Sequence, residues 1–80
     1  MVIEITDHAR ERMQKYAVME ETLKDAINNP DSTVKSYDDR TIYQKKLNGY
    51  VLRVIVEENK GIKRVITVYK ARSGRHEIQI

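Results

Sequence analysis

Four side chains in the second half of the chain are of the types that bind a phosphate or move a proton. They are Gln44, Lys46, Arg53 and Tyr69. To cleave an RNA strand, a site must take a proton from the 2′-hydroxyl, stabilise the pentacoordinate phosphate with fixed cations and give a proton to the leaving 5′-oxygen. Lysine or tyrosine can act in the proton transfers, and arginine can hold the phosphate. Isolated lysine and tyrosine titrate at about pH 10. Because clustered cations lower such pKa values, a cluster of cations would be part of this chemistry.

A second pair of candidate residues lies near the N-terminus. His8 and Arg12 are four positions apart, so on a helix they are one turn above each other and could reach a cleft between helix and sheet. Histidine is the usual proton shuttle near neutral pH, and the arginine could anchor a phosphate. A surface histidine beside an arginine that covers the edge of the core is the alternative. For the sheet residues, the alternative is a face that is merely solvated.

The stretch from Asn59 to His76 contains six basic residues and no acidic one. Such an imbalance favours a polyanion as the partner, and RNA in particular. We predict that the last part of this stretch contacts nucleic acid, and that Gln44 on the sheet does so too. The predicted contact residues are Gln44, Lys70, Arg72, Arg75 and His76.

Length and composition limit the class of protein. Eighty residues predict a single domain, residues 1–80, and the 40% hydrophobic and 34% charged content indicates a globular chain rather than a disordered one. The absence of cysteine excludes a disulfide framework, and two distant histidines make a metal site improbable, so no cofactor is expected. The sequence has no recognisable secretory signal and no apolar run of membrane-spanning length, so we expect a cytoplasmic protein without a membrane partner.

The first 30 residues predict one strand and two helices. Residues 2–5 are typical of a short strand, and Thr6 or Asp7 can cap a helix that runs to about Tyr16. A second helix is expected from about Met19 to Asn28. Pro30 ends it, because the residue before a proline is disfavoured in the helical region.

From Thr33 onward the apolar period is two, which predicts an antiparallel sheet. The sequence Leu47-Asn48-Gly49-Tyr50 is typical of a two-residue type I′ hairpin turn, which places Leu47 opposite Tyr50 and Tyr43 opposite Val54. A three-residue loop at residues 59–61 is then expected to place Arg53 opposite Thr67. This register puts Ile66 and Val68 in the core. It leaves Gln44, Lys46, Arg53, Thr67 and Tyr69 on the other face.

The order of these motifs resembles that of small uncharacterised proteins related to the RelE and BrnT toxins. The resemblance rests on the His-x-x-x-Arg helix at 8–12, the Asn-Pro at 29–30, the strand at 42–46, Leu-Arg-Val at 52–54 and Val-Ile-Thr-Val-Tyr-Lys at 65–70. It spans nearly the whole chain. Where relatives often have Arg-Gly between the helices, this chain has Tyr16-Ala17.

This resemblance implies an α+β, RelE/ParE-like fold in which both helices cover one face of an antiparallel sheet. It also implies metal-independent RNA cleavage by Lys46, Arg53 and Tyr69, with His8 and Arg12 matching the family helix, and neutralisation by an acidic antitoxin. We therefore expect a toxin-type endoribonuclease. The alternative is a non-catalytic module that binds RNA or a protein through the same face, since ParE relatives act on gyrase and a fold does not determine an activity.

Overall fold

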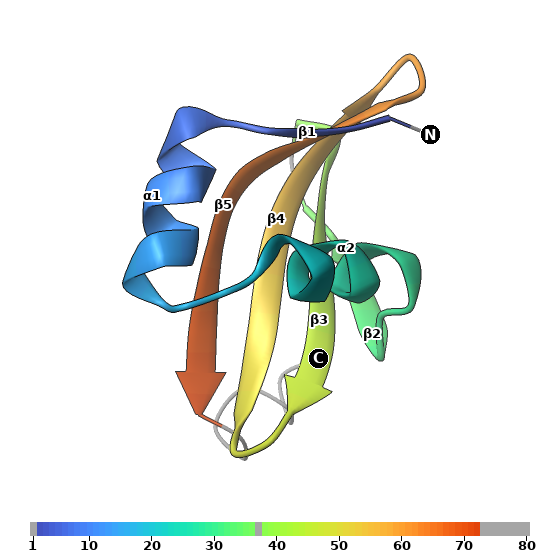
Figure 1. The fold of residues 1–80 in the computed structure, drawn as a ribbon. Helices are drawn as coiled ribbons and strands as arrows, with labels where there is room; N and C mark the ends of the chain where they lie inside the picture. The colour runs from blue at the N-terminus through green and yellow to red at the C-terminus, as the bar shows by residue number, and fades with distance from the viewer. Residues whose placement is uncertain (1, 37, 73–80) are drawn as a thin grey trace.

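The computed structural model describes residues 2–36 and 38–72, which form two helices and one five-stranded sheet (Figure 1). In chain order the elements are β1 (Val2–Ile5), α1 (Asp7–Lys15), α2 (Glu20–Asn28), β2 (Ser32–Lys35), β3 (Arg40–Leu47), β4 (Tyr50–Asn59) and β5 (Ile62–Arg72). The predicted order of a strand, two helices and then strands is confirmed. The fold class is α+β.

The sheet is mixed, not antiparallel throughout as the sequence predicted. Its strand order is β1-β5-β4-β3-β2, and β1 pairs with β5 in parallel, with Val2 opposite Ile62. Thr6 fixes the end of β1 to β5, because its backbone N–H and its hydroxyl both donate to the carbonyl oxygen of Val65, at 3.3 and 2.8 Å. The two helices then carry the chain across the sheet to β2 at the opposite edge.

Helix α1 begins and ends with well-formed caps. The Thr6 side-chain oxygen accepts a hydrogen bond from the Ala9 N–H at 3.1 Å, as expected for an N-cap residue. At the other end, the Val18 N–H donates to the Met13 carbonyl at 2.8 Å and the Ala17 N–H donates to the Gln14 carbonyl at 3.2 Å. This is a Schellman motif, and it holds Ala17 in the left-handed region at φ 54°.

Helix α2 is tied to the sheet at its C-terminal end. The Asn29 N–H donates to the Asp25 carbonyl, and Pro30 follows, so the helix ends where the sequence predicted. Lys45 on β3 donates from Nζ to the Asn29 carbonyl oxygen at 2.7 Å. A cation placed there pairs with the negative end of the helix dipole and fixes α2 over β3. Neither described helix is long and apolar enough to cross a membrane.

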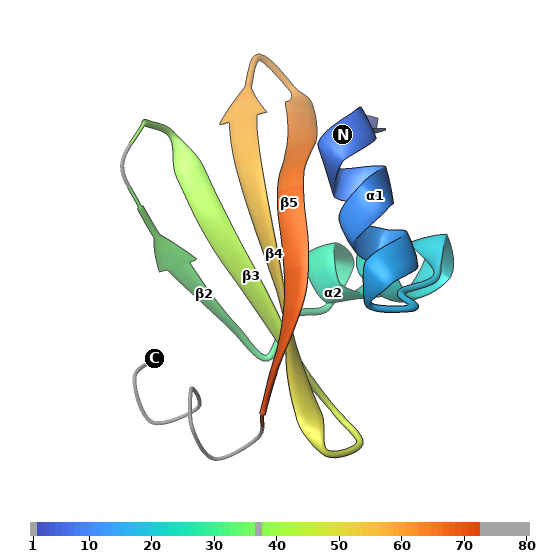
Figure 2. The same ribbon diagram turned by 90° about the vertical axis from the view of Figure 1, so that its left-hand side faces the viewer.

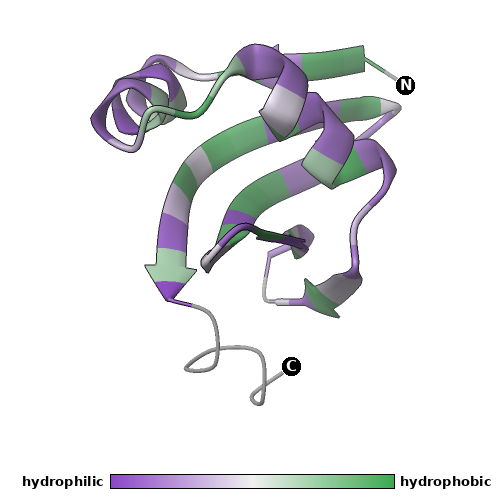
Figure 3. Ribbon diagram, turned by 60° about the horizontal axis from the view of Figure 1, so that its bottom comes forward, coloured by the Kyte–Doolittle hydropathy of each residue, from purple (hydrophilic) through white to green (hydrophobic). Residues whose placement is uncertain are grey.

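Both helices lie on one face of the sheet, as predicted (Figure 2). Ala9 and Met13 from α1 and Leu23, Ala26 and Ile27 from α2 are buried against it. Val18, between the helices, belongs to the same core, and the strands contribute its other buried side chains, which are Tyr43, Leu52, Val54, Val56, Val65 and Val68. Hydrophobic and hydrophilic residues therefore mix along each strand, as Figure 3 shows, because only one face of the sheet meets the helices.

The predicted pairing of β3 with β4 is confirmed. Leu47 is opposite Tyr50, Tyr43 is opposite Val54 and Gln44 is opposite Arg53. The turn type differs from the prediction, because a type I′ turn needs a positive φ at both central residues and only Gly49, at 77°, has one. The register is the same for either two-residue turn.

The predicted pairing of β4 with β5 is wrong. The loop has two residues, Lys60 and Gly61, both at positive φ, so Asn59 is opposite Ile62. A β-bulge at Ile66 then shifts the register, and Arg53 comes to lie opposite Tyr69 rather than Thr67. Val65 takes the core position that we had expected for Ile66.

Candidate functional site

Four side chains form one row across the sheet, on the face away from the helices. The pairings Ser32–Gln44, Gln44–Arg53 and Arg53–Tyr69 define the row on four adjacent strands. Residues directly opposite each other on neighbouring strands point to the same face. This face, which we call the open face, thus carries Gln44, Arg53 and Tyr69 side by side.

Arg53 and Tyr69 are in direct contact in this row. The centre of the Arg53 guanidinium lies over the Tyr69 ring, 5.4 Å from its centroid, which is within the range of a cation–π interaction. Both side chains are half-buried. The ring thus holds the guanidinium at a defined place on the sheet.

Lys46 lies in the next row of the same face, opposite Val51. Its side chain is exposed, and its backbone N–H donates to the Asp31 carboxylate at 2.6 Å. That bond fixes the end of β3 beside the start of β2. Because Lys46 is opposite Val51 and Gln44 is opposite Arg53, Lys46 is a diagonal neighbour of Arg53. The structure thus brings together Lys46, Arg53 and Tyr69 of the predicted catalytic set.

His8 and Arg12 are on the other side of the sheet. They lie on α1, which packs on β5 through Ala9 and Met13. Arg10 forms an ion pair with Glu20 of α2, at 4.0 Å, and helical geometry puts positions 8 and 12 on the opposite flank of α1. His8 and Arg12 thus face away from α2 and are not brought to the open-face row.

The predicted nucleic-acid contacts are also divided between the faces. Gln44 is on the open face, whereas Lys70 is opposite Leu52 and its Nζ lies 4.4 Å from the centroid of the Tyr50 ring, on the helix side. Arg72 is exposed and lies opposite Tyr50. Arg75 and His76 lie outside the described residues.

In the folded protein, two basic residues of the acid-free stretch, residues 59–76, lie beside acidic residues from other strands. Arg64 forms ion pairs with Glu4 at 3.1 Å and with Glu57 at 3.6 Å, and Lys63 pairs with Glu58 at 4.0 Å. These carboxylates come from β1 and β4, outside the stretch. Two of its six cations are therefore compensated, and the case for a polyanion partner now depends on the remaining cations.

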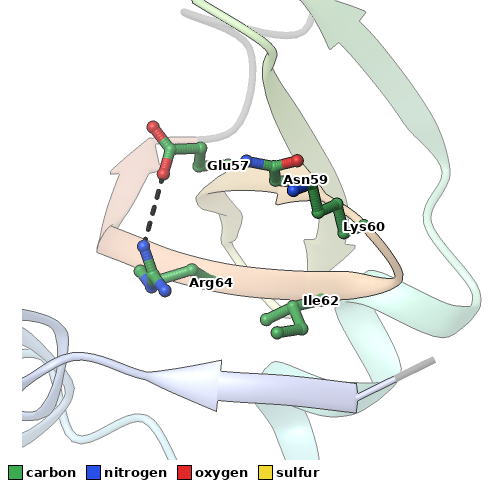
Figure 4. A pocket seen from close by; sticks show the side chains of 5 residues that line it. All are labelled: Glu57, Asn59, Lys60, Ile62 and Arg64. Atoms are coloured by element: carbon green, nitrogen blue, oxygen red, sulfur yellow. Dashed lines mark ion pairs between the residues drawn. The ribbon is translucent and has the colours of Figure 1, made fainter.

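A hollow at the tip of the β4–β5 hairpin is the other candidate binding site near the open face. It has a volume of about 130 Å³ and is lined by Glu57, Asn59, Lys60, Ile62 and Arg64 (Figure 4). The arginine in it is held by two carboxylates, those of Glu4 and Glu57. Its charge is thus already neutralised, which disfavours an anion site there.

Tyr43 shows how a polar group is accommodated on the helix side. Its hydroxyl donates a hydrogen bond to Glu58, and the Lys63 Nζ lies 5.0 Å from the centroid of its ring. Burial, followed by the hydrogen bond and the charge of Glu58, raises the pKa of Tyr43. The hydroxyl thus keeps its proton, which suits a structural role.

One member of the row, Ser32, was not predicted from the sequence. Its place depends on the pairing of β2 with β3, which neither predicted hairpin turn joins. The alternation from Ser32 to Lys35, followed by Asp38 and Asp39 before the next strand, was the available signal, because aspartate tolerates the left-handed turn conformation that both residues adopt. Among the described residues there is no cluster of three or more His, Cys, Asp or Glu side chains that could hold a metal ion.

Comparison with known proteins gives one match. A family model described as "Domain of unknown function (DUF4258)" matches residues 5–70, from the end of β1 to nearly the end of β5. The match includes the whole open-face row. No curated protein and no solved structure matches the chain.

Proposed function

The chain belongs to the DUF4258 family, and from that premise we propose that it is a metal-independent endoribonuclease that binds single-stranded RNA on its open face. The observation that carries the proposal is the guanidinium of Arg53 over the ring of Tyr69, on a sheet face that the helices do not cover. A fixed cation beside an aromatic ring suits a phosphate with an adjacent base. The resemblance to RelE-like and BrnT-like toxins supports the same function, with the cytoplasm as its location.

In the proposed reaction, Arg53 binds the scissile phosphate. Tyr69 or Lys46, in its unprotonated form, accepts the proton of the 2′-hydroxyl, and the 2′-oxygen attacks phosphorus. The bond from phosphorus to the 5′-oxygen breaks, and the other of the two residues, in its protonated form, protonates that oxygen. The products are a 2′,3′-cyclic phosphate and a free 5′-hydroxyl. No metal or cofactor takes part in these steps.

The second candidate function is an RNA-binding module without catalysis. The observation that favours it is the position of His8 and Arg12 on α1, on the other side of the sheet from Arg53. Binding needs only the cation and the ring, whereas cleavage needs proton donors and acceptors placed to within about half an ångström. An acidic protein of the antitoxin type should compete for the same cations in either case.

The test is to identify the products of RNA incubated with the purified protein in the presence of EDTA. We expect fragments that end in a 2′,3′-cyclic phosphate, and about a hundredfold slower cleavage by Arg53→Ala, because one fixed cation is lost from the transition state. Lys70→Ala is the matched control, since it removes one positive charge from the other face. Cleavage by Arg53→Ala at the wild-type rate would contradict the proposal. Binding without any cleavage would establish the module instead.

A separate variant tests the role of the Tyr69 hydroxyl. Tyr69→Phe retains the ring that supports Arg53, so we expect it to lower the cleavage rate more than the RNA affinity. Equal loss of both would show that the hydroxyl serves binding alone.

A further inference from the structure

Gln44 has an unusual environment for a glutamine. Its side chain is 1% exposed, although it lies on the face away from the helices. Neither its amide nitrogen nor its amide oxygen has a hydrogen-bond partner among the residues that the structure describes. Buried amides are nearly always hydrogen-bonded, because an unmet donor and acceptor lose their hydration without compensation. Such a group therefore needs an explanation.

The neighbours of Gln44 indicate which ligand its amide could bind. Arg53 lies beside it on β4, and Tyr69 follows on β5, so an amide, a cation and an aromatic ring succeed each other along one row. A carboxamide presents a donor and an acceptor side by side. The edges of unpaired nucleobases present the complementary pair, and single-stranded RNA is commonly recognised by such edge contacts together with stacking on aromatic rings.

We propose that Gln44 is the base-recognition residue of the open face, and that its amide forms a paired hydrogen bond with the edge of an unpaired nucleobase. This inference rests on the proposed function in one respect, since it takes RNA as the ligand. A nucleotide laid along the row has its base edge at Gln44 and its phosphate at Arg53, and the next base stacks on Tyr69. The amide is only 1% exposed, so the side chains over it must move apart for a base to reach it.

The experiment uses Gln44→Met, which keeps a side chain of similar size and removes both hydrogen-bonding atoms. The probe is a fluorescent, fully 2′-O-methylated RNA oligonucleotide, which cannot undergo attack by the 2′-oxygen, and inorganic polyphosphate serves as a polyanion without bases. We expect Gln44→Met to lower the affinity for the oligonucleotide roughly tenfold. Its affinity for polyphosphate should equal that of the wild type, and its melting temperature should not fall. Gln14→Met, on α1, is the matched control and should change neither affinity.

Three results would overturn the inference. The first is an unchanged affinity of Gln44→Met for the oligonucleotide. The second is an equal loss of affinity for the oligonucleotide and for polyphosphate, which would make the effect electrostatic or global. The third is a lower melting temperature, which would show that the amide stabilises the fold.

The outcome is separable from that of the cleavage test. If the wild-type protein binds the methylated oligonucleotide through Gln44 but does not cleave unmodified RNA, the endoribonuclease proposal fails and the base-recognition role stands. If the wild type cleaves RNA but Gln44→Met binds the oligonucleotide as tightly as the wild type does, the endoribonuclease proposal stands and the base-recognition role fails.

Discussion

The two faces of the sheet differ in how their polar groups are satisfied. On the helix side, Leu52 and Val54 are fully buried, and the polar residues near them have partners: Tyr43 bonds to Glu58, and Lys45 bonds to the end of α2. On the open face, the amide of Gln44 is buried without a hydrogen bond from a described residue. Apolar packing against the helices thus stabilises the fold on one face, while the other keeps an arrangement that stability alone does not explain.

This difference suggests where function lies. Sequences generally satisfy local structure, packing and hydrogen bonding together, and exceptions gather at functional sites. The exception here is a buried amide beside a cation stacked on an aromatic ring. Adjacent residues of β4 therefore lie on faces of different character, and substitutions in β4 can separate the effects of the two faces.

The largest effect is expected at Leu52, beside Arg53 in sequence but on the opposite face. Leu52→Ala should lower the free energy of unfolding by about 2–5 kcal/mol, because it leaves a cavity in the core. Arg53→Ala should lower it by only about 1 kcal/mol, since it removes a cation–π contact and part of a half-buried side chain. Urea denaturation of both variants measures this. Similar losses would show that Arg53 is structural and would remove the contrast between the faces.

A smaller effect, which depends on pH, is expected at Tyr43. At neutral pH, Tyr43→Phe should cost about 1–2 kcal/mol, because Glu58 loses a hydrogen-bond donor. The raised pKa of Tyr43 means that the unfolded chain ionises first, near the ordinary value of 10.0, while the folded protein still holds the proton. Wild-type stability should therefore fall as the pH rises above that value, and the phenylalanine variant should lack this part of the loss.

The measurement for Tyr43 is urea denaturation of both proteins at pH 8 and at pH 11. The advantage of the wild type over Tyr43→Phe should shrink at the higher pH. A constant difference between the two proteins would contradict the raised pKa of Tyr43, which burial and then the hydrogen bond to Glu58 cause.

The sequence predicted the features of this fold that local pattern controls. Gly49 and the alternation on either side of it fixed the pairing of Leu47 with Tyr50, and Pro30 fixed the end of α2. The β4–β5 register was wrong because the loop has two residues rather than three and because Ile66 is bulged. Residues 65, 66 and 68 are all apolar, so alternation does not reveal the bulge. The parallel pairing of Val2 with Ile62 has no local signal, since the partners are sixty positions apart.

The candidate site was predictable only in part, because it depends on the same β4–β5 pairing. Arg53 and Tyr69 were assigned to the correct face, because the shorter turn and the bulge together leave the side of Tyr69 unchanged. Their direct opposition was not predicted. The acid-free stretch misled us at Arg64, whose acidic partners Glu4 and Glu57 reach it only through strand pairing.

A stabilising substitution is expected at Ala17, in the turn between the helices. Alanine is strained at a φ of 54°, and glycine is the usual residue at this position of a Schellman motif. Ala17→Gly should therefore raise the free energy of unfolding by about 0.5–1 kcal/mol, after allowance for the greater freedom of glycine in the unfolded chain. Glu11→Gly, in the middle of α1, is the control and should lower it by about 1 kcal/mol. Loss of stability in both variants would show that Ala17 contributes packing which outweighs its strain.

The smallest expected effect compares one lysine from each face in RNA binding. Each phosphate contact on a single strand contributes about −0.7 to the slope of log affinity against log salt concentration, because counterions are released. Lys46 is exposed beside Arg53 on the open face, whereas Lys70 lies over the Tyr50 ring on the helix side. We expect Lys46→Ala to flatten the slope by about 0.7 and Lys70→Ala to leave it unchanged, measured with the methylated oligonucleotide. Both variants lose one positive charge, so a general effect of net charge would change them equally. A flatter slope in Lys70→Ala alone would place the RNA on the helix side of β5, the face on which the sequence-predicted contacts Lys70 and Arg72 lie.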